Sequence, residues 1–206
     1  MQRIIFLRHM TLCDLPYNNF PERILKMVYI FLANGFEEIE ALTQVDYLRR
    51  AGIDIVTVGI EDDCIYGAHN IPVVCDTTID EAEISDDIEM IILPGGLGGV
   101  DGISACKKAN DIIDYCVERG KYVTAICAAP TILAKKGYLK DKHAVCYPAM
   151  LDELSDCKNT DGRVAIDGKF ITAAAAGVSE EFSFALIEAL CGKEAAEKVR
   201  KGIVAR

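Results

Sequence analysis

The chain has 206 residues, of which 51% are hydrophobic and 26% are charged. This composition excludes a disordered polar chain and, at about 150 residues per domain, favours one globular domain. The formal charge of −10 repels nucleic-acid phosphates and anionic membrane surfaces, so nucleic-acid binding is disfavoured. No apolar run approaches the roughly 18 residues that span a bilayer, and Ile4–Leu7 is too short for the core of a signal peptide. We therefore expect a soluble, cytoplasmic protein that does not bind membranes.

The first 26 residues differ from the rest of the chain. They hold four basic residues against two acidic ones, and Pro16 and Pro21 interrupt any regular element. Met27 directly precedes a clean strand pattern. We therefore expect residues 1–26 to be an N-terminal extension or leader, with an upstream start site as one explanation, and residues 27–206 to form the domain.

From Met27 onward the chain alternates strand and helix patterns. A continuous apolar run predicts a buried parallel strand at Val28–Ala33. Further strands are expected at Ile53–Ile60, at Ile88–Leu93, which is apolar except for Glu89, and at Tyr122–Ile126. Periodic apolar positions predict helices at Glu38–Ala51, Cys106–Arg119 and Ala128–Lys136, the first ended by Gly52 and the last by Gly137.

The C-terminal part adds a hairpin and two helices. Val164–Ile166 and Phe170–Ala173 flank Asp167-Gly168, a dipeptide typical of tight hairpin turns. Ser179 is the expected N-cap of a helix that ends at Leu190, and Lys193–Val204 forms the last helix. The order of elements predicts an α/β fold with a doubly wound, mostly parallel sheet and helices on both faces. In such a fold ligands bind at the carboxyl ends of the strands.

Cys127 is the first candidate for chemistry. It lies at a predicted strand-to-helix junction, with Pro130 in the first helical turn. The free N–H groups and positive dipole end of a helix lower the pKa of a thiol and form half of an oxyanion hole, as in a nucleophile elbow. The apolar neighbours of Cys127 also suit a buried structural cysteine. The nine cysteines are otherwise scattered and never spaced as Cys-x-x-Cys, so we expect reduced thiols and no metal site.

Glu40 is the second candidate. Its neighbours on the predicted helix suit the core, so its carboxyl must face solvent or have a special partner. A carboxyl pressed against a thiolate has a raised pKa, stays protonated and donates a hydrogen bond to sulfur, which would make Glu40 a proton shuttle. Alternatively, Glu37, Glu38 and Glu40 form an ordinary acidic first turn that complements the helix dipole.

Gly95 and Gly96 follow a predicted strand and permit close approach of the backbone to a ligand. The Gly96 N–H is therefore the candidate for the second half of the oxyanion hole. Most Pro-Gly-Gly triplets are only turns, so this motif alone is weakly specific.

Taken together, several segments resemble the ThiJ/PfpI superfamily and, within it, the branch of the parkinsonism-associated deglycase (DJ-one-like proteins). The segments are Ala33–Glu40, Val45–Gly52, Ile92–Gly96, Ala125–Pro130, Ser179–Phe182 and Glu188–Glu194. The resemblance extends over residues 27–205 and implies a flavodoxin-like fold and, usually, a homodimer. It implies Cys127 as the reactive, oxidation-prone cysteine and Glu40 as its protonated partner. Members are credited with cofactor-free glyoxalase or deglycase activity on 2-oxoaldehydes, with redox sensing and with chaperone-like protection.

Two positions depart from patterns within this superfamily. Peptidase and amidotransferase branches place His after the nucleophile, whereas Ala128 follows Cys127 here, so a Cys-His peptidase is not expected. The animal pattern has His before Pro148, where this chain has Tyr147. A tyrosine hydroxyl with a pKa near 10 is no base at neutral pH, although it donates hydrogen bonds. Bacterial relatives also tend to carry an aromatic residue here, which indicates a branch.

The remaining candidates are auxiliary. Cys146 either resolves an oxidised Cys127 by forming a disulfide or is a small buried strand residue. None of the three histidines completes a triad, and each is expected at the surface: His9 in the N-terminal extension, His69 in a hairpin and His143 near a strand start.

The sequence thus predicts an enzyme for small 2-oxoaldehydes such as methylglyoxal that requires no metal, flavin or glutathione. Cys127 attacks the aldehyde, the N–H groups of Gly96 and Ala128 hold the oxyanion, and Glu40 moves a proton between the two carbons. The rival hypothesis is a redox sensor or holdase in which Cys127 oxidises to a sulfinate stabilised by Glu40. Both hypotheses use the same residues. A role in thiazole biosynthesis is a third, weaker possibility.

Overall fold

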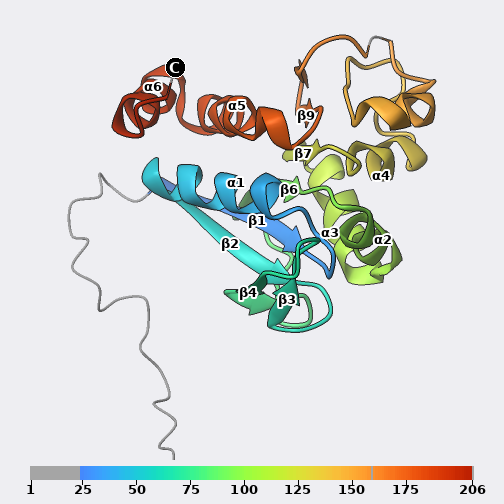
Figure 1. The fold of residues 1–206 in the computed structure, drawn as a ribbon, viewed down its shortest axis with the longest axis horizontal. Helices are drawn as coiled ribbons and strands as arrows, with labels where there is room; N and C mark the ends of the chain where they lie inside the picture. Colours follow the sequence, from blue (N-terminus) through green and yellow to red (C-terminus); the bar gives the residue numbers. More distant parts are fainter. Residues whose placement is uncertain (1–23, 159, 206) are drawn as a thin grey trace, which may run out of the picture.

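The computed structural model describes residues 24–158 and 160–205. Predictions that concern residues 1–23, including His9, lie outside the described residues. The core of the molecule is a seven-stranded sheet (Figure 1). In spatial order its strands are β5 (Thr77–Thr78), β2 (Ile53–Gly59), β1 (Ile24–Leu32), β6 (Ile88–Leu93), β7 (Tyr122–Ile126), β9 (Phe170–Ala173) and β8 (Val164–Asp167). Every neighbouring pair is parallel except β8 with β9, which confirms the mostly parallel sheet.

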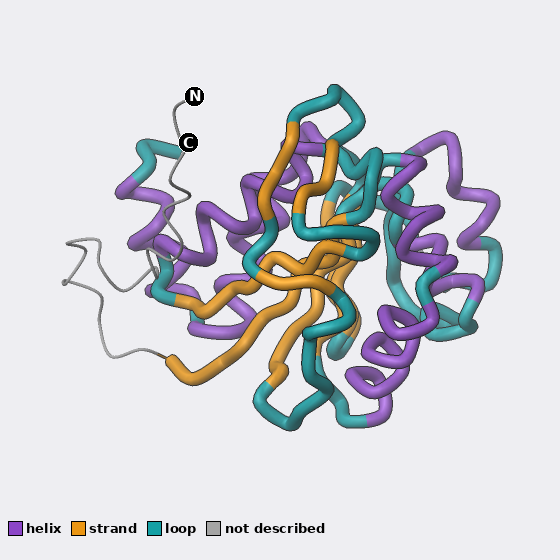
Figure 2. Tube along the Cα trace, turned by 90° about the horizontal axis from the view of Figure 1, so that it is seen from below, coloured by secondary structure: helices purple, strands orange, loops and turns teal. Residues whose placement is uncertain are grey.

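Helices cover both faces of the sheet, as Figure 2 shows. One face carries α1 (Glu38–Arg50), α5 (Ser179–Cys191) and α6 (Lys193–Gly202), and the other carries α2 (Leu97–Ala105), α3 (Lys107–Glu118) and α4 (Pro130–Lys135). Alternate residues of β1 point to opposite faces, so Val28, Ile30 and Leu32 join one core while Tyr29 and Phe31 join the other. Two short 3₁₀ turns, Pro148–Leu154 and Ala176–Val178, complete the architecture. Among the described helices none is long and apolar enough to cross a membrane.

A small antiparallel hairpin stands apart from the main sheet. Its strands are β3 (Cys64–Tyr66) and β4 (Pro72–Val74), and His69 lies in the connection between them, as the sequence predicts. A parallel bridge between Phe36 and Gly67 attaches this hairpin to the loop after β1. The hairpin therefore flanks the carboxyl end of β1.

Most predicted elements are confirmed, and the differences have physical causes. The strands β6 and β7 have the predicted bounds, whereas β1 begins at Ile24, where it pairs with Ile53. The helix predicted from Ala128 begins only at Pro130, because the chain first turns sharply through Cys127. Ser179 is the first residue of α5 and not its N-cap, since the turn before it leads straight into the helix and Val178 takes the cap position.

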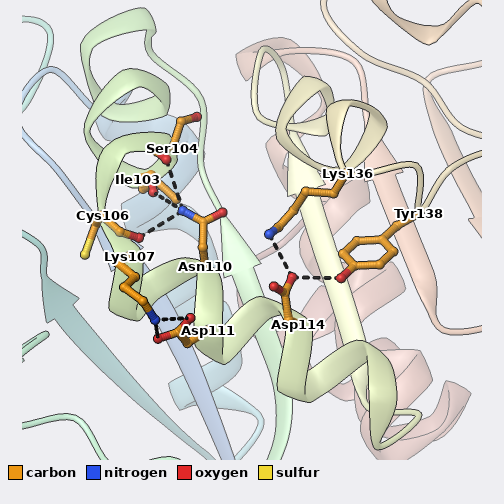
Figure 3. A network of polar contacts seen from close by, with 9 residues as sticks. All are labelled: Ile103, Ser104, Cys106, Lys107, Asn110, Asp111, Asp114, Lys136 and Tyr138. Atoms are coloured by element: carbon orange, nitrogen blue, oxygen red, sulfur yellow. Dashed lines mark hydrogen bonds and ion pairs between the residues drawn. The ribbon is translucent and has the colours of Figure 1, made fainter.

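Polar contacts link α2, α3 and α4 on one face of the sheet (Figure 3). The Asn110 side chain donates to the carbonyls of Ile103, Ser104 and Cys106 at 3.1, 3.0 and 2.9 Å, where α2 gives way to α3. Asp114 of α3 accepts from Lys136 and Tyr138, both at 2.8 Å, at the end of α4. These contacts hold α4, which follows Cys127, against α3.

Candidate functional site

Cys127 occupies a sharp turn between β7 and α4. Its φ of 62° lies in the left-handed region, which is costly for a residue with a side chain. The surrounding backbone holds this conformation, because the Cys127 N–H donates to the Ala173 carbonyl at 2.9 Å and the Cys127 carbonyl accepts the Tyr147 N–H at 2.7 Å. A strained residue at a strand-to-helix turn is the geometry of a nucleophile elbow. The structure therefore gives Cys127 the backbone geometry that the sequence predicts.

Glu40 lies in the first turn of α1 and is 1% exposed. Its Oε2 accepts the Gly95 N–H at 3.0 Å, and its carboxyl also bonds the Cys127 thiol and the Ala176 N–H. Gly95 is needed at this contact, since an added Cβ would lie 2.7 Å from the Cys127 Cβ and overlap the Glu40 carboxyl. Glu40 is therefore not part of a solvated acidic first turn.

Two backbone N–H groups face the sulfur. Those of Ala128 and Gly96 both bond Cys127 and lower the pKa of its thiol. Gly96 has a φ of 86° and precedes α2, and an added Cβ there would lie 2.6 Å from the Glu37 nitrogen. The two donors named as the oxyanion hole thus converge on one atom.

The carboxyl and the thiol share a desolvated site. Burial raises the pKa of Glu40 to about 7, which is the direction that the sequence predicts. Burial, and then the charge and hydrogen bond of Glu40, raise the pKa of Cys127 to about 12 and outweigh the two N–H donors. This net rise is opposite to the effect expected from a helix N-terminus alone. Because like charges face each other here, the pair holds at least one proton at neutral pH.

The two auxiliary candidates, Tyr147 and Cys146, differ in how they lie relative to Cys127. Tyr147 contacts Cys127 through its backbone, and its side chain is 45% exposed. Cys146 packs in the core on the α2–α4 side, whereas Cys127 packs against the core on the α1–α5 side. The Cys146 thiol faces the Tyr147 carbonyl at 3.4 Å, and burial, followed by Cys157, raises its pKa to about 11. The segment that holds Cys146 is irregular rather than a strand.

Sequence reasoning missed one group at the site and one beside it. The first is the Ala176 N–H, which comes from the loop after β9, a fourth strand that ends at this edge. Its alanine-rich sequence carries no polar side chain that signals a role. The second is His69, an exposed hairpin residue whose Nδ1 lies 2.8 Å from the Glu38 carboxylate. His143 is half-buried and its N–H donates to Asp167, away from Cys127.

A doubly wound sheet with a cysteine at a strand-to-helix turn, a buried carboxyl beside the sulfur and two N–H donors defines a class of α/β proteins. The chain belongs to the DJ-1/PfpI family, which residues 26–189 match. Protein dj-1beta of Drosophila melanogaster is 34% identical over 182 residues, which cover 87% of this chain and 97% of that protein. Protein DJ-1 homolog B of Arabidopsis thaliana is 36% identical over 185 residues, or 88% of this chain and 42% of the plant protein. The chain therefore spans less than half of that relative.

Solved structures agree with the fold assignment. The crystal structure of Drosophila melanogaster DJ-1beta matches with a TM-score of 0.83 at 33% identity, covering 88% of this chain and 98% of the other. Toxoplasma gondii DJ-1, described as oxidized, matches with a TM-score of 0.82 at 30% identity, covering 87% and 98%. A relative from Caenorhabditis elegans, named glutathione-independent glyoxalase DJR-1.2, is 27% identical over 167 residues, or 80% of this chain and 88% of the worm protein. The flavodoxin-like α/β fold is thus shared with DJ-1 proteins.

Proposed function

We propose that this protein is a glutathione-independent glyoxalase or deglycase-type enzyme that acts on 2-oxoaldehydes such as methylglyoxal. The observation that carries the proposal is the buried Glu40 carboxyl hydrogen-bonded to the Cys127 thiol, with two N–H donors at the sulfur. Such a pair supplies a nucleophile, a proton carrier and an oxyanion site within one crevice. The activity in the name of the worm relative supports the same reaction.

The reaction needs only the chain, the substrate and water. The Cys127 sulfur adds to the aldehyde carbon while the thiol proton passes through Glu40 to the carbonyl oxygen, which gives a hemithioacetal. The N–H groups of Gly96 and Ala128 hold the oxygen as charge develops. Glu40 then takes the proton from this carbon and returns a proton to the neighbouring carbon, while the hydroxyl proton passes to the neighbouring carbonyl oxygen, which converts the hemithioacetal to a thioester. Water hydrolyses the thioester to lactate and regenerates the thiol, so one carbon is oxidised and the other reduced.

Lactate production from methylglyoxal, without glutathione or added metal, tests this proposal. We expect turnover by the unmodified protein and a loss of at least about 100-fold in kcat/KM for both Cys127→Ser and Glu40→Gln. Cys146→Ser is the matched control, because that thiol packs in the other core and we expect it to retain activity. Turnover that is absent from the unmodified protein, or unchanged in either site variant, would contradict the proposal.

A redox function is the second candidate. Its support is that Cys127 is only partly buried and hydrogen-bonded to a carboxyl that can donate to a sulfinate, and that a solved relative is described as oxidized. After mild peroxide treatment, mass spectrometry should locate two added oxygen atoms on Cys127 in the unmodified protein. Glu40→Gln should reduce this product in favour of further oxidation. An unmodified Cys127 peptide would remove the redox hypothesis and leave the enzymatic one standing.

We also propose that the protein is a homodimer in a reducing compartment such as the cytoplasm. The eight described cysteines are all free, which suits a reducing environment. Ile39 and Leu42 are exposed on α1 beside an open groove of about 560 Å³, and a second copy would cover this apolar surface.

A further inference from the structure

A second cluster of chemically active groups lies outside the Cys127 site. It consists of Glu37 and Glu38 at the start of α1 and His69 in the β3–β4 connection. One ligand atom from each residue lies within 4.8 Å of the other two. His69 Nδ1 is 2.8 Å from Glu38 Oε2 and 3.9 Å from Glu37 Oε2. Two segments far apart in the sequence thus bring an imidazole and two carboxylates together.

The cluster is built into the fold rather than formed by chance contact of mobile side chains. Glu38 is 5% exposed, and its Oε1 accepts the backbone N–H of His69 at 2.7 Å. This contact turns Oε2 toward the His69 imidazole. Gly67 allows this packing, because an added Cβ would lie 2.6 Å from Glu38 Cγ and overlap the carboxylate. The Ala68 N–H donates to the Phe36 carbonyl at 2.7 Å and fixes the hairpin to the residue before Glu37. Both halves of the cluster are therefore held by backbone contacts.

The spacing suits a small divalent metal ion. Zinc binds imidazole nitrogen and carboxylate oxygen at about 2.0–2.2 Å, so donor atoms around a tetrahedral ion are separated by about 3.3–3.6 Å. The separations of 2.8 and 3.9 Å lie on either side of this range, and both reach it if the His69 and Glu37 side chains move by up to about 0.5 Å. The Glu37 side chain is 20% exposed and that of His69 is 69% exposed, which leaves room for this movement and for a water ligand. An imidazole donor disfavours Mg²⁺ and Ca²⁺, which prefer oxygen ligands.

We propose that Glu37, Glu38 and His69 bind one Zn²⁺-type divalent transition-metal ion, with water in the fourth position. This site contains neither Cys127 nor Glu40. The sequence predicts no metal site, so this proposal departs from that prediction, and the proposed site lies beside the reaction at Cys127 rather than within it.

Zn²⁺ titration of the full chain without an affinity tag tests the proposal. Cys127→Ser serves as the background, since the Cys127 and Glu40 pair offers an alternative site. We expect this background protein to bind Zn²⁺, and His69→Ala to weaken one equivalent at least tenfold. Glu37→Gln should also weaken that equivalent, and this variant keeps the size of a partly exposed side chain. His143→Ala, which changes a histidine outside the cluster, should leave binding unchanged.

Cobalt distinguishes the ligand sets. Co²⁺ bound to nitrogen and oxygen should show weak visible bands without the strong near-ultraviolet absorption of a thiolate ligand, and His69→Ala should abolish these bands. Binding that disappears in Cys127→Ser, or that is equally tight in His69→Ala and its background, would overturn the proposal. A cobalt spectrum with thiolate absorption that depends on Cys127 would assign the metal to the Cys127 site instead.

Discussion

At the residue scale, two carboxyl groups on the same turn of α1 behave in opposite ways. Burial tends to raise the pKa of both Glu38 and Glu40. At Glu38 the hydrogen bonds from the His69 ring and backbone, together with the His69 charge, outweigh burial and lower the pKa. At Glu40 the partners are a thiol and backbone N–H groups, and burial raises the pKa to about 7. The deeper burial of Glu40 and the imidazole partner of Glu38 together decide which carboxyl carries a proton at neutral pH.

The raised pKa of Glu40 predicts a pH dependence of stability. Because the folded protein holds this proton more tightly than the unfolded chain, stability is fully present below the ordinary pKa of 4.5 and falls as pH rises toward 7. A shift of this size corresponds to about 3 kcal/mol. Glu40→Gln removes the titrating group but keeps the shape and the Glu38–His69 pair. Denaturant unfolding of both proteins at several pH values should show a steeper decline for the unmodified protein. Parallel declines would show that Glu40 titrates normally.

At the element scale, the glycines of α2 allow close packing but make this helix difficult to predict from the sequence. Gly98, Gly99 and Gly102 lie within nine residues, and glycine disfavours helices, so the sequence does not predict this element. The structure needs them, because a Cβ at Gly98 would lie 2.8 Å from the Asn34 carbonyl oxygen and one at Gly99 2.8 Å from Phe36 Cα. The helix therefore packs directly against the loop that leads to Glu40.

The junction between α2 and α3 provides a test of how these helices are held. Asn110→Ala leaves three carbonyls without their side-chain donor and should lower the free energy of unfolding by about 1 kcal/mol (Figure 3). Lys107→Ala is the matched control on the same helix, since its ion pair with Asp111 is exposed and should contribute little. Chemical denaturation of both variants measures the difference. Equal effects would show that the Asn110 contacts do not fix the junction.

How well the sequence predicts a feature of this structure depends on how far apart along the chain the interacting residues lie. Strands β6 and β7 are mostly apolar runs, interrupted only by Glu89 and Thr124, and the Asp167-Gly168 turn is local chemistry, so all three are predicted correctly. Placement of Cys127, Glu40 and Gly96 at strand ends is also readable, because parallel strands end at one edge. The Glu38–His69 contact is not readable, since it depends on how a three-residue hairpin strand pairs and docks. The Ala176 contact is made by its backbone N–H, so no side chain in the sequence indicates it.

At the scale of the whole molecule, the order of the strands in the sheet brings the residues of the site together. The segments that carry Glu40, Gly95, Cys127 and Ala176 follow β1, β6, β7 and β9, which are consecutive neighbours in the sheet. Adjacent parallel strands place these segments side by side, although Glu40 and Gly95, for example, are 55 residues apart along the chain. The topology thus assembles one thiol, one carboxyl and several N–H donors without a long-range side-chain network.

The same molecule leaves an apolar surface on α1, which predicts its oligomeric state. Ile39 and Leu42 are 56% and 37% exposed beside the groove that α1 forms with the start of α5. A twofold dimer would place this patch against its own copy and remove it from water. Light scattering should give a mass near twice 22.5 kDa, and Leu42→Glu should shift it toward 22.5 kDa. Ile166→Glu, which changes an exposed apolar residue on β8, should leave the dimer intact. A monomeric unmodified protein would contradict the homodimer, and a dimeric Leu42→Glu protein would place its interface elsewhere.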